Sequence, residues 1–277
     1  MDRLTALKSI AAEAGRGELS FPTNVNATLK LQRALGEPDC HIEEAARLAQ
    51  AEPLLAARTV AIANSVAYNR SGNDVTNVRA AVQRVGFRTL GALAASVIVR
   101  QLASEITDPA LRLKADQLWA HSAHVAALAQ VIARRVSFVD PETAMFAGIV
   151  HEVGGFYLLS RASSYPGLLD GGADEWIEHG EVAIGRGVLL KLGVPVAVMG
   201  AIEALWNGMR ALPPETLGDT LLLANDLAPV SSPLLERPGA TTPESAATID
   251  FTTGAGTLAQ VLAESAEEVK SLTSALM

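Results

Sequence analysis

The chain has 277 residues, 49% hydrophobic and 19% charged, so it is long enough for a sizeable core and too apolar to be disordered. Its net charge of -8 argues against a general nucleic-acid binder, and its single cysteine, Cys40, excludes an internal disulfide or a cysteine-based zinc site. The N-terminus lacks a basic stretch followed by a long apolar core. The most apolar run, residues 91–99, is far shorter than the roughly 20 residues that span a bilayer. We therefore expect a cytoplasmic protein that does not enter a membrane.

The periodicity predicts an all-α fold. Alanine and leucine dominate nearly every periodic segment, and alternating β-branched or aromatic residues between tight turns are almost absent. After an N-terminal segment, 1–19, we expect a first helical sub-bundle over 20–107. A second sub-bundle over 108–230 follows, and then a Pro/Ser/Thr-rich loop and a C-terminal amphipathic helix over 231–277.

The first sub-bundle is rich in arginine. Six arginines lie between residues 58 and 100, against one acid, Asp74. Arg84 and Arg88 are four residues apart on one predicted helix and are candidates for contact with an anionic small ligand or an acidic partner. The simpler interpretation, which the sequence alone favours, is that these arginines cover solvated helix faces.

Two helix starts are legible in the second sub-bundle. Asp108 precedes Pro109 and Asp140 precedes Pro141, which is typical of an N-cap followed by the first helical turn.

The second sub-bundle also holds the side chains from which a metal site could be built. The candidate ligands are His121, His124, His151, Glu152, His179 and Glu181. The first two histidines are three residues apart and lie near one helical face. His151 and Glu152 are adjacent and diverge by about 100° around a helix. The spacing does not show that the six converge, and histidines in Ala-rich helices are more often packed or surface residues.

Residues 51–94, "AEPLLAARTVAIANSVAYNRSGNDVTNVRAAVQRVGFRTLGALA", resemble the hallmark of the HDOD family. In that hallmark a helix ends in Asn-Ser, here Asn64-Ser65, and a later helix carries a spaced Ala and Gly, here Ala81 and Gly86. The family usually has Asp-Pro where this chain has Glu52-Pro53. The segments "WAHSAHVAALA", "AMFAGIVHEVGGFYLL" and "GRGVLLKLGVPVAVMGAIEALWNG" continue the match, which covers about residues 20–210. From the residue types alone, we expect Asn64 and Ser65 to satisfy backbone groups where their helix ends.

The resemblance implies a multi-helical fold of two packed sub-bundles, the second similar to the HD domain of metal phosphohydrolases. Residue by residue, His121 and His151 match two histidine ligands of those enzymes. Glu152 stands where they have Asp, and Glu181 where they have another histidine. Leu205 and Trp206 occupy the place of paired histidines, and no Gly-Tyr-Pro motif follows.

This ligand set is incomplete for a two-metal site. Leu offers no lone pair and the Trp indole only donates, so neither can replace an imidazole. We therefore expect no bound metal, no cofactor and no enzymatic activity. The resemblance then implies a signal-transduction or regulatory protein that works through protein contacts or a small ligand, without direct nucleic-acid binding. The alternative is a divergent phosphohydrolase, such as a cyclic di-GMP or nucleotide phosphodiesterase, in which His124 or His179 replaces a lost ligand.

Overall fold

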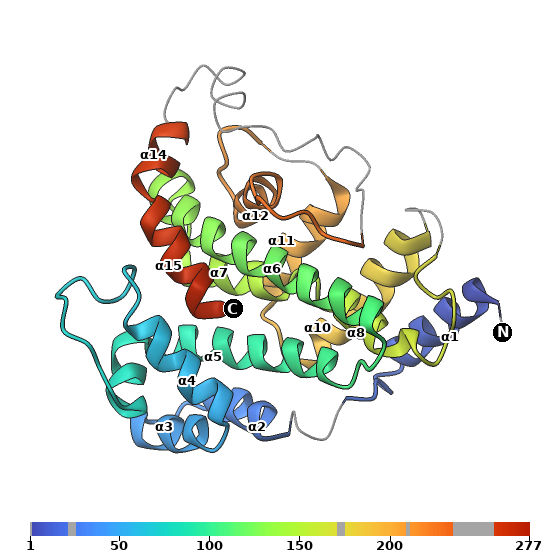
Figure 1. The fold of residues 1–277 in the computed structure, drawn as a ribbon, viewed down its shortest axis with the longest axis horizontal. Helices are drawn as coiled ribbons and strands as arrows, with labels where there is room; N and C mark the ends of the chain where they lie inside the picture. The colour runs from blue at the N-terminus through green and yellow to red at the C-terminus, as the bar shows by residue number, and fades with distance from the viewer. Residues whose placement is uncertain (1, 22–25, 171–174, 209–210, 235–257) are drawn as a thin grey trace.

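The computed structural model describes residues 2–21, 26–170, 175–208, 211–234 and 258–277. Helices make up 72% of the structure, and no strand occurs among the described residues. The predicted all-α class is therefore confirmed. Figure 1 shows the helices packed in several directions around a shared interior, with α2 to α5 at one end of the molecule and α11 and α12 at the other.

The N-terminal part holds five helices: α1 (Arg3–Gly15), α2 (Asn26–Leu35), α3 (Ile42–Gln50), α4 (Pro53–Ala63) and α5 (Val78–Ser104). The second part begins with α6 (Pro109–Ile132), η2 (Ala133–Ser137), α7 (Pro141–Val150) and α8 (Val153–Ala162). It continues with η3 (Trp176–Gly185), α10 (Arg186–Lys191), α11 (Val196–Asn207) and α12 (Leu217–Asp226). The chain ends in α14 (Leu258–Glu264) and α15 (Ala266–Leu276). The C-terminal segment that was predicted as one helix is thus two, with a break at Ser265.

The predicted helix starts at Asp108 and Asp140 are confirmed. Asp108 Oδ1 accepts hydrogen bonds from the backbone N–H groups of Ala110 and Leu111, at 2.8 and 2.9 Å. Asp140 Oδ1 accepts from the N–H of Thr143 at 2.7 Å. These caps satisfy N–H groups that have no partner inside the helix, and so they fix where α6 and α7 begin.

Helix α5 joins the two parts. It contacts α2, α3 and α4 on the N-terminal side of the chain and α6, α7 and α8 of the second part. By length and composition α5 is apolar enough to cross a membrane, but 67% of its most apolar window is buried inside the protein, as in a core helix. The helix is kinked at Gly86, whose φ of 79° lies in the left-handed region that favours glycine. Arg84 and Arg88, predicted four residues apart on one helix, therefore lie on opposite sides of this kink.

The chain between α4 and α5 is held by the Asn-Ser pair. Asn64 Nδ2 donates to the carbonyl oxygen of Val75, and Asn64 Oδ1 accepts from the N–H of Val75, both at 2.9 Å. Ser65 Oγ donates to the carbonyl oxygen of Ile62 at 2.7 Å. The structural role predicted for both residues is confirmed, because their side chains satisfy backbone groups at the end of a helix and at the far side of a loop.

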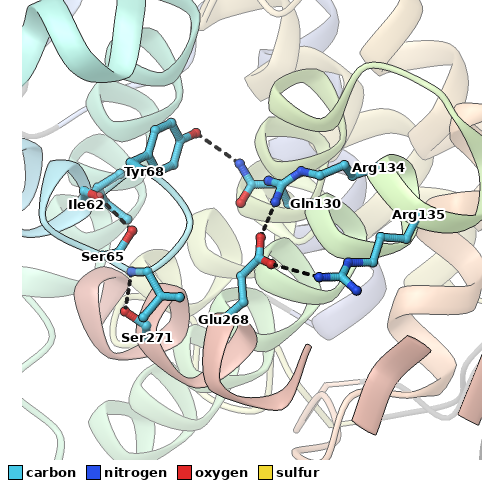
Figure 2. A network of polar contacts seen from close by, with 9 residues as sticks. Ile62, Ser65, Tyr68, Gln130, Arg134, Arg135, Glu268 and Ser271 are labelled. Atoms are coloured by element: carbon cyan, nitrogen blue, oxygen red, sulfur yellow. Dashed lines mark hydrogen bonds and ion pairs between the residues drawn. The ribbon is translucent and has the colours of Figure 1, made fainter. Parts of the chain in front are cut away.

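Helix α15 packs against both α4 and α6. Figure 2 shows the polar contacts that hold it. Glu268 forms ion pairs with Arg134 and Arg135 in η2, which directly follows α6. Ser271 Oγ accepts from the N–H of Val66 at 3.1 Å. Nearby, Gln130 Nε2 donates to the Tyr68 hydroxyl at 3.0 Å. The loop after α4 and the end of α6 are therefore linked both directly and through α15.

Helices α6 and α7 cross at very short range. A Cβ atom on Gly148 would lie 2.5 Å from the Cα and 2.7 Å from the backbone nitrogen of Ala126, closer than real Cβ atoms come. Only glycine therefore allows the two backbones to approach this closely. The crossing sets the distance between the side chains that α6 and the end of α7 carry.

We predict that Gly148→Ala lowers the free energy of unfolding by about 1–3 kcal/mol, because the added methyl group forces α6 and α7 apart. Gly200→Ala is the matched control, since Gly200 is exposed in α11 and has nothing within 4 Å of its added Cβ. That control should gain about 0.5–1 kcal/mol from the higher helix propensity of alanine. Urea denaturation measures both changes. Equal effects of the two substitutions would contradict the close approach.

We predict that Asn64→Ala lowers the free energy of unfolding by about 1 kcal/mol or more, because both backbone groups of Val75 lose their partner. Asn207→Ala, at an exposed position in the last turn of α11, is the control and should leave the stability nearly unchanged. Thermal melting of the two variants tests this. An unaltered melting temperature for Asn64→Ala would point instead to a role of Asn64 in binding.

Candidate functional site

The segment around His151 and Glu152 is not one continuous helix. Helix α7 ends at Val150 and α8 begins at Val153, with Glu152 at φ -105° and ψ 18° between them. Our expectation that the two side chains diverge around a helix is therefore wrong. The break turns the imidazole of His151 and the carboxylate of Glu152 toward each other, with 3.9 Å between His151 Nε2 and Glu152 Oε1.

His121 on α6 joins this pair. Its Nε2 lies 3.3 Å from Nε2 of His151, and the two ring centroids are 5.3 Å apart. His121, His151 and Glu152 each offer one donor atom, and these atoms lie within 4.8 Å of one another. The three residues are only 2–3% exposed. The structure thus brings together three of the residues that the sequence marked as candidate ligands.

The hydrogen bonds of the two histidines fix which ring nitrogen carries the proton. His121 Nδ1 lies 2.7 Å from the carbonyl oxygen of Val230, and His151 Nδ1 lies 2.7 Å from that of Gly148. A carbonyl oxygen only accepts, so both Nδ1 atoms must be the protonated ones. In the neutral rings each Nε2 then presents a lone pair to the other. Two lone pairs at this distance repel each other, so the geometry favours a proton or a cation between them, next to the Glu152 carboxylate.

The remaining histidines of the second part lie outside this cluster. His124 Nδ1 bonds the carbonyl oxygen of Ala120 on its own helix at 2.8 Å, and the side chain lines a cavity beside α14 and α15. His179 on η3 lies 3.9 Å from Glu178. Neither is one of the three donors that meet. The side chain of Glu181 falls outside the described residues, so the predicted correspondence of Glu181 stays a prediction.

Leu205 and Trp206 are placed on α11, which packs against α7 and α12. The Leu205 side chain is fully buried and belongs to the hydrophobic core. The Trp206 ring packs against Gly185, where an added Cβ would lie 3.3 Å from Cζ2 of the indole. The indole Nε1 is buried and has no hydrogen-bond partner within the described part of the chain. An apolar side chain and a bulky donor thus stand on this helix, and neither can bind a metal.

A segment after α12 closes over the cluster. Residues 229–234, called here the covering segment, supply the Val230 carbonyl to His121 and the Ser231 carbonyl to Gln117 Nε2 at 3.4 Å. The Leu234 side chain lies over Gly155, close to the Glu152 carboxylate: an added Cβ on Gly155 would be 2.7 Å from Leu234 Cδ1 and 3.5 Å from Glu152 Oε2. The covering segment thus accounts for part of the burial of the three donors.

The donor set fits one divalent ion and not two. Two imidazole Nε2 atoms and one carboxylate are a ligand set found in single-metal sites. A two-metal centre needs further donors to hold and bridge the second ion, and the described side chains bring no fourth donor into the group.

The two arginines proposed as anion contacts have different environments. Arg84 donates from Nη1 to the carbonyl oxygen of Ala63 at 3.1 Å and from Nη2 to that of Asn73 at 2.8 Å, so it supports the loop after α4. Arg88 is exposed and pairs with Asp140 at the start of α7 at 2.7 Å. Arg88 also lines a cavity between the two parts of the molecule.

Comparison with known proteins identifies the family. The model of the HDOD domain matches residues 21–175, which is more than half of the chain. A search of the curated proteins finds no match.

Among solved structures, a protein from Shewanella amazonensis provisionally named a metal-dependent phosphohydrolase has a TM-score of 0.75 at 22% identity, with all of both chains covered. An HDOD domain protein of unknown function from Geobacter sulfurreducens gives a TM-score of 0.62 at 21% identity, covering 99% of this chain and 97% of its own. A protein from Marinobacter aquaeolei provisionally named a signal transduction protein gives 0.59 at 18% identity, covering 99% of this chain and 66% of its own. At these identities the likenesses establish the fold, and together with the family match they show that this chain belongs to the HDOD family.

Proposed function

We propose that this protein is a non-catalytic, cytoplasmic regulatory module of the HDOD family that transmits signals through contacts with other proteins or through a small ligand. The observation that carries the proposal is the state of the His121, His151 and Glu152 cluster. Among the described residues its donors are too few for two metals, and they are buried beneath the covering segment. A fold that is shared with enzymes does not imply their chemistry.

The number of donors is the first support. Hydrolysis by a two-metal site needs one ion to activate water and another to stabilise the leaving oxygen. The three donors could hold at most one ion, and Leu205 and Trp206 add none. The name of the Marinobacter aquaeolei protein agrees with a signalling role, and the net charge of -8 agrees with partners other than nucleic acid.

Access is the second support. A phosphodiester must reach the reacting centre, but the three side chains are at most 3% exposed. The covering segment would have to leave both His121 and Gly155 before a substrate could enter. This movement breaks the 2.7 Å hydrogen bond between His121 and the Val230 carbonyl and exposes the Leu234 side chain to water. Both steps cost free energy that a substrate would have to supply.

One observation favours a second candidate, a divergent phosphohydrolase. The Nε2 atoms of both histidines face each other beside a carboxylate, and both Nδ1 protons are fixed by carbonyl oxygens. Such backbone contacts are typical of histidines that bind a metal. An ion held here would act as a Lewis acid toward a phosphoryl oxygen or a water molecule. In this candidate the covering segment would have to open during each catalytic cycle.

The closed site can be tested by chemical modification. Diethyl pyrocarbonate should react with exposed His41 and leave His121 and His151 nearly unmodified, as measured by peptide mass spectrometry. Leu234→Asp should increase modification of both buried histidines, because a carboxylate does not stay in the apolar contact that Leu234 makes over Gly155. Leu113→Asp, at a position 70% exposed on α6, is the control and should change nothing. Fast modification of His121 in the unaltered protein would show that the cluster is open.

The absence of catalysis is tested directly. After dialysis, elemental analysis should find well below one equivalent of transition metal per chain. Neither cyclic di-GMP nor bis(p-nitrophenyl) phosphate should be hydrolysed with added manganese. The double variant His121→Ala/His151→Ala should fold, as circular dichroism can check. It should then reverse the phenotype of a strain that lacks the gene as fully as the unaltered protein does. Tightly held metal and turnover that both disappear in the folded double variant would establish the phosphohydrolase instead.

A further inference from the structure

A cavity of about 540 Å³ lies between the two parts of the molecule, away from the histidine cluster. Its walls come from α2 and α5 on one side and from α7, α10 and the start of α11 on the other. This volume is within the range of sites that take small molecules and cofactors. The cavity is not part of the site described above, and none of the three cluster residues lines it.

The body of the cavity is apolar. Its lining includes Leu35, Phe87, Phe146, Leu192 and Val198. Two glycines, Gly36 and Gly91, also line the cavity beside α2 and α5, and they place no side chain in it. An added Cβ on Gly91 would meet only Leu35 Cδ1, at 3.8 Å, so there is open space at this position. Such a lining suits a flat apolar group.

The charges around the cavity are mostly positive. Arg33, Arg88 and Lys191 line it, against a single acid, Glu142. Within the described residues Arg33 has no ion-pair partner, whereas Arg88 is paired with Asp140 and Lys191 Nζ donates to the carbonyl oxygen of Gly17 at 3.3 Å. Burial, and then repulsion by Asp140, raise the pKa of Glu142 above its usual value. In a chain with a net charge of -8, this excess of cationic groups favours an anion.

One polar atom in the lining lacks a partner. The amide oxygen Oε1 of Gln32 is buried and accepts no hydrogen bond within the described structure. A buried acceptor without a donor costs free energy. A ligand N–H or O–H group would remove that cost once the Gln32 side chain turned its oxygen, which is closed off from solvent, toward the cavity.

We propose that this cavity binds a small amphipathic anion: a molecule with an aromatic or similarly flat apolar body, one acidic group that meets Arg33 and Lys191, and a hydrogen-bond donor for Gln32. The walls come from both parts of the chain, and the ion pair between Arg88 and Asp140 joins those parts beside the cavity. An occupant therefore contacts both sub-bundles at once. The proposal does not depend on whether the histidine cluster is catalytic.

Anilinonaphthalene sulfonate is a suitable probe, because it combines two aromatic groups, one sulfonate and one N–H. We expect its fluorescence to saturate at one molecule per chain. The neutral analogue N-phenylnaphthylamine should bind more weakly. The double variant Arg33→Glu/Lys191→Glu should raise the Kd of the sulfonate by roughly tenfold and reduce its dependence on salt. Arg47→Glu, an exposed arginine on α3 that does not line the cavity, is the charge control.

Gly91→Leu tests the location. Its side chain should fill the cavity and abolish saturable binding, while helix propensity and the free space around the Cβ keep the fold intact. Gly200→Leu, on an exposed face of α11 outside the cavity, should bind the probe like the unaltered protein. Binding that survives Gly91→Leu, equal affinity for the charged and neutral probes, or no saturable binding would each overturn the proposal. A dimer interface would also overturn the proposal. In that case the affinity for the probe would fall at protein concentrations where sedimentation shows a dimer, because a second copy of the chain would occupy the cavity.

Discussion

The close crossing of α6 and α7 is the constraint on which the centre of this molecule depends. Gly148 meets the backbone of Ala126 at a distance that no other residue allows, and the end of α7 is thereby held against α6. His151 follows three residues after Gly148 and bonds its carbonyl oxygen, while His121 lies a little over one turn before Ala126. The spacing of the two imidazoles is therefore set by backbone packing and by a local hydrogen bond, which are both properties of the fold.

The packing also accounts for two histidines in the interior of the fold. A buried imidazole must find partners for its ring nitrogens, and here each Nδ1 bonds a backbone carbonyl. His121 in addition ties the covering segment to α6. Substitution by an apolar residue would leave the Val230 carbonyl without its donor, so stability alone is a sufficient reason for a polar side chain at this position. The same contacts would also suit a metal ligand. The presence of the histidines therefore does not distinguish a regulatory module from a phosphohydrolase, and the accessibility of the two imidazoles is the property to measure.

Much of the fold follows from the sequence, because helix signals are local. The periodicity of Ala and Leu and the Asp-Pro starts at Asp108 and Asp140 depend on residues within a few positions of one another. The Asn64 anchor reaches somewhat farther, to Val75 across one loop. The cluster itself was only partly predictable. Its three members stood out by residue type, but the break between α7 and α8 and the cover by residues 229–234 depend on tertiary contacts that no spacing reveals. The kink at Gly86 was missed for a similar reason, since glycine within a helix is often merely tolerated.

The position of α1 has a consequence for how the chain acquires its structure during synthesis. This helix leaves the ribosome before the helices that follow it in the chain, yet it packs against η3 and α10, and Arg3 donates to the carbonyl oxygen of Leu168. Ala14 lies against Gly187, far along the chain. The apolar face of α1, with Leu7 and Ile10, must wait until those later helices have emerged before it is covered. Translation at roughly 5–20 residues per second makes this a delay of about ten seconds or more, during which an unpaired apolar helix is available to chaperones or to neighbouring nascent chains.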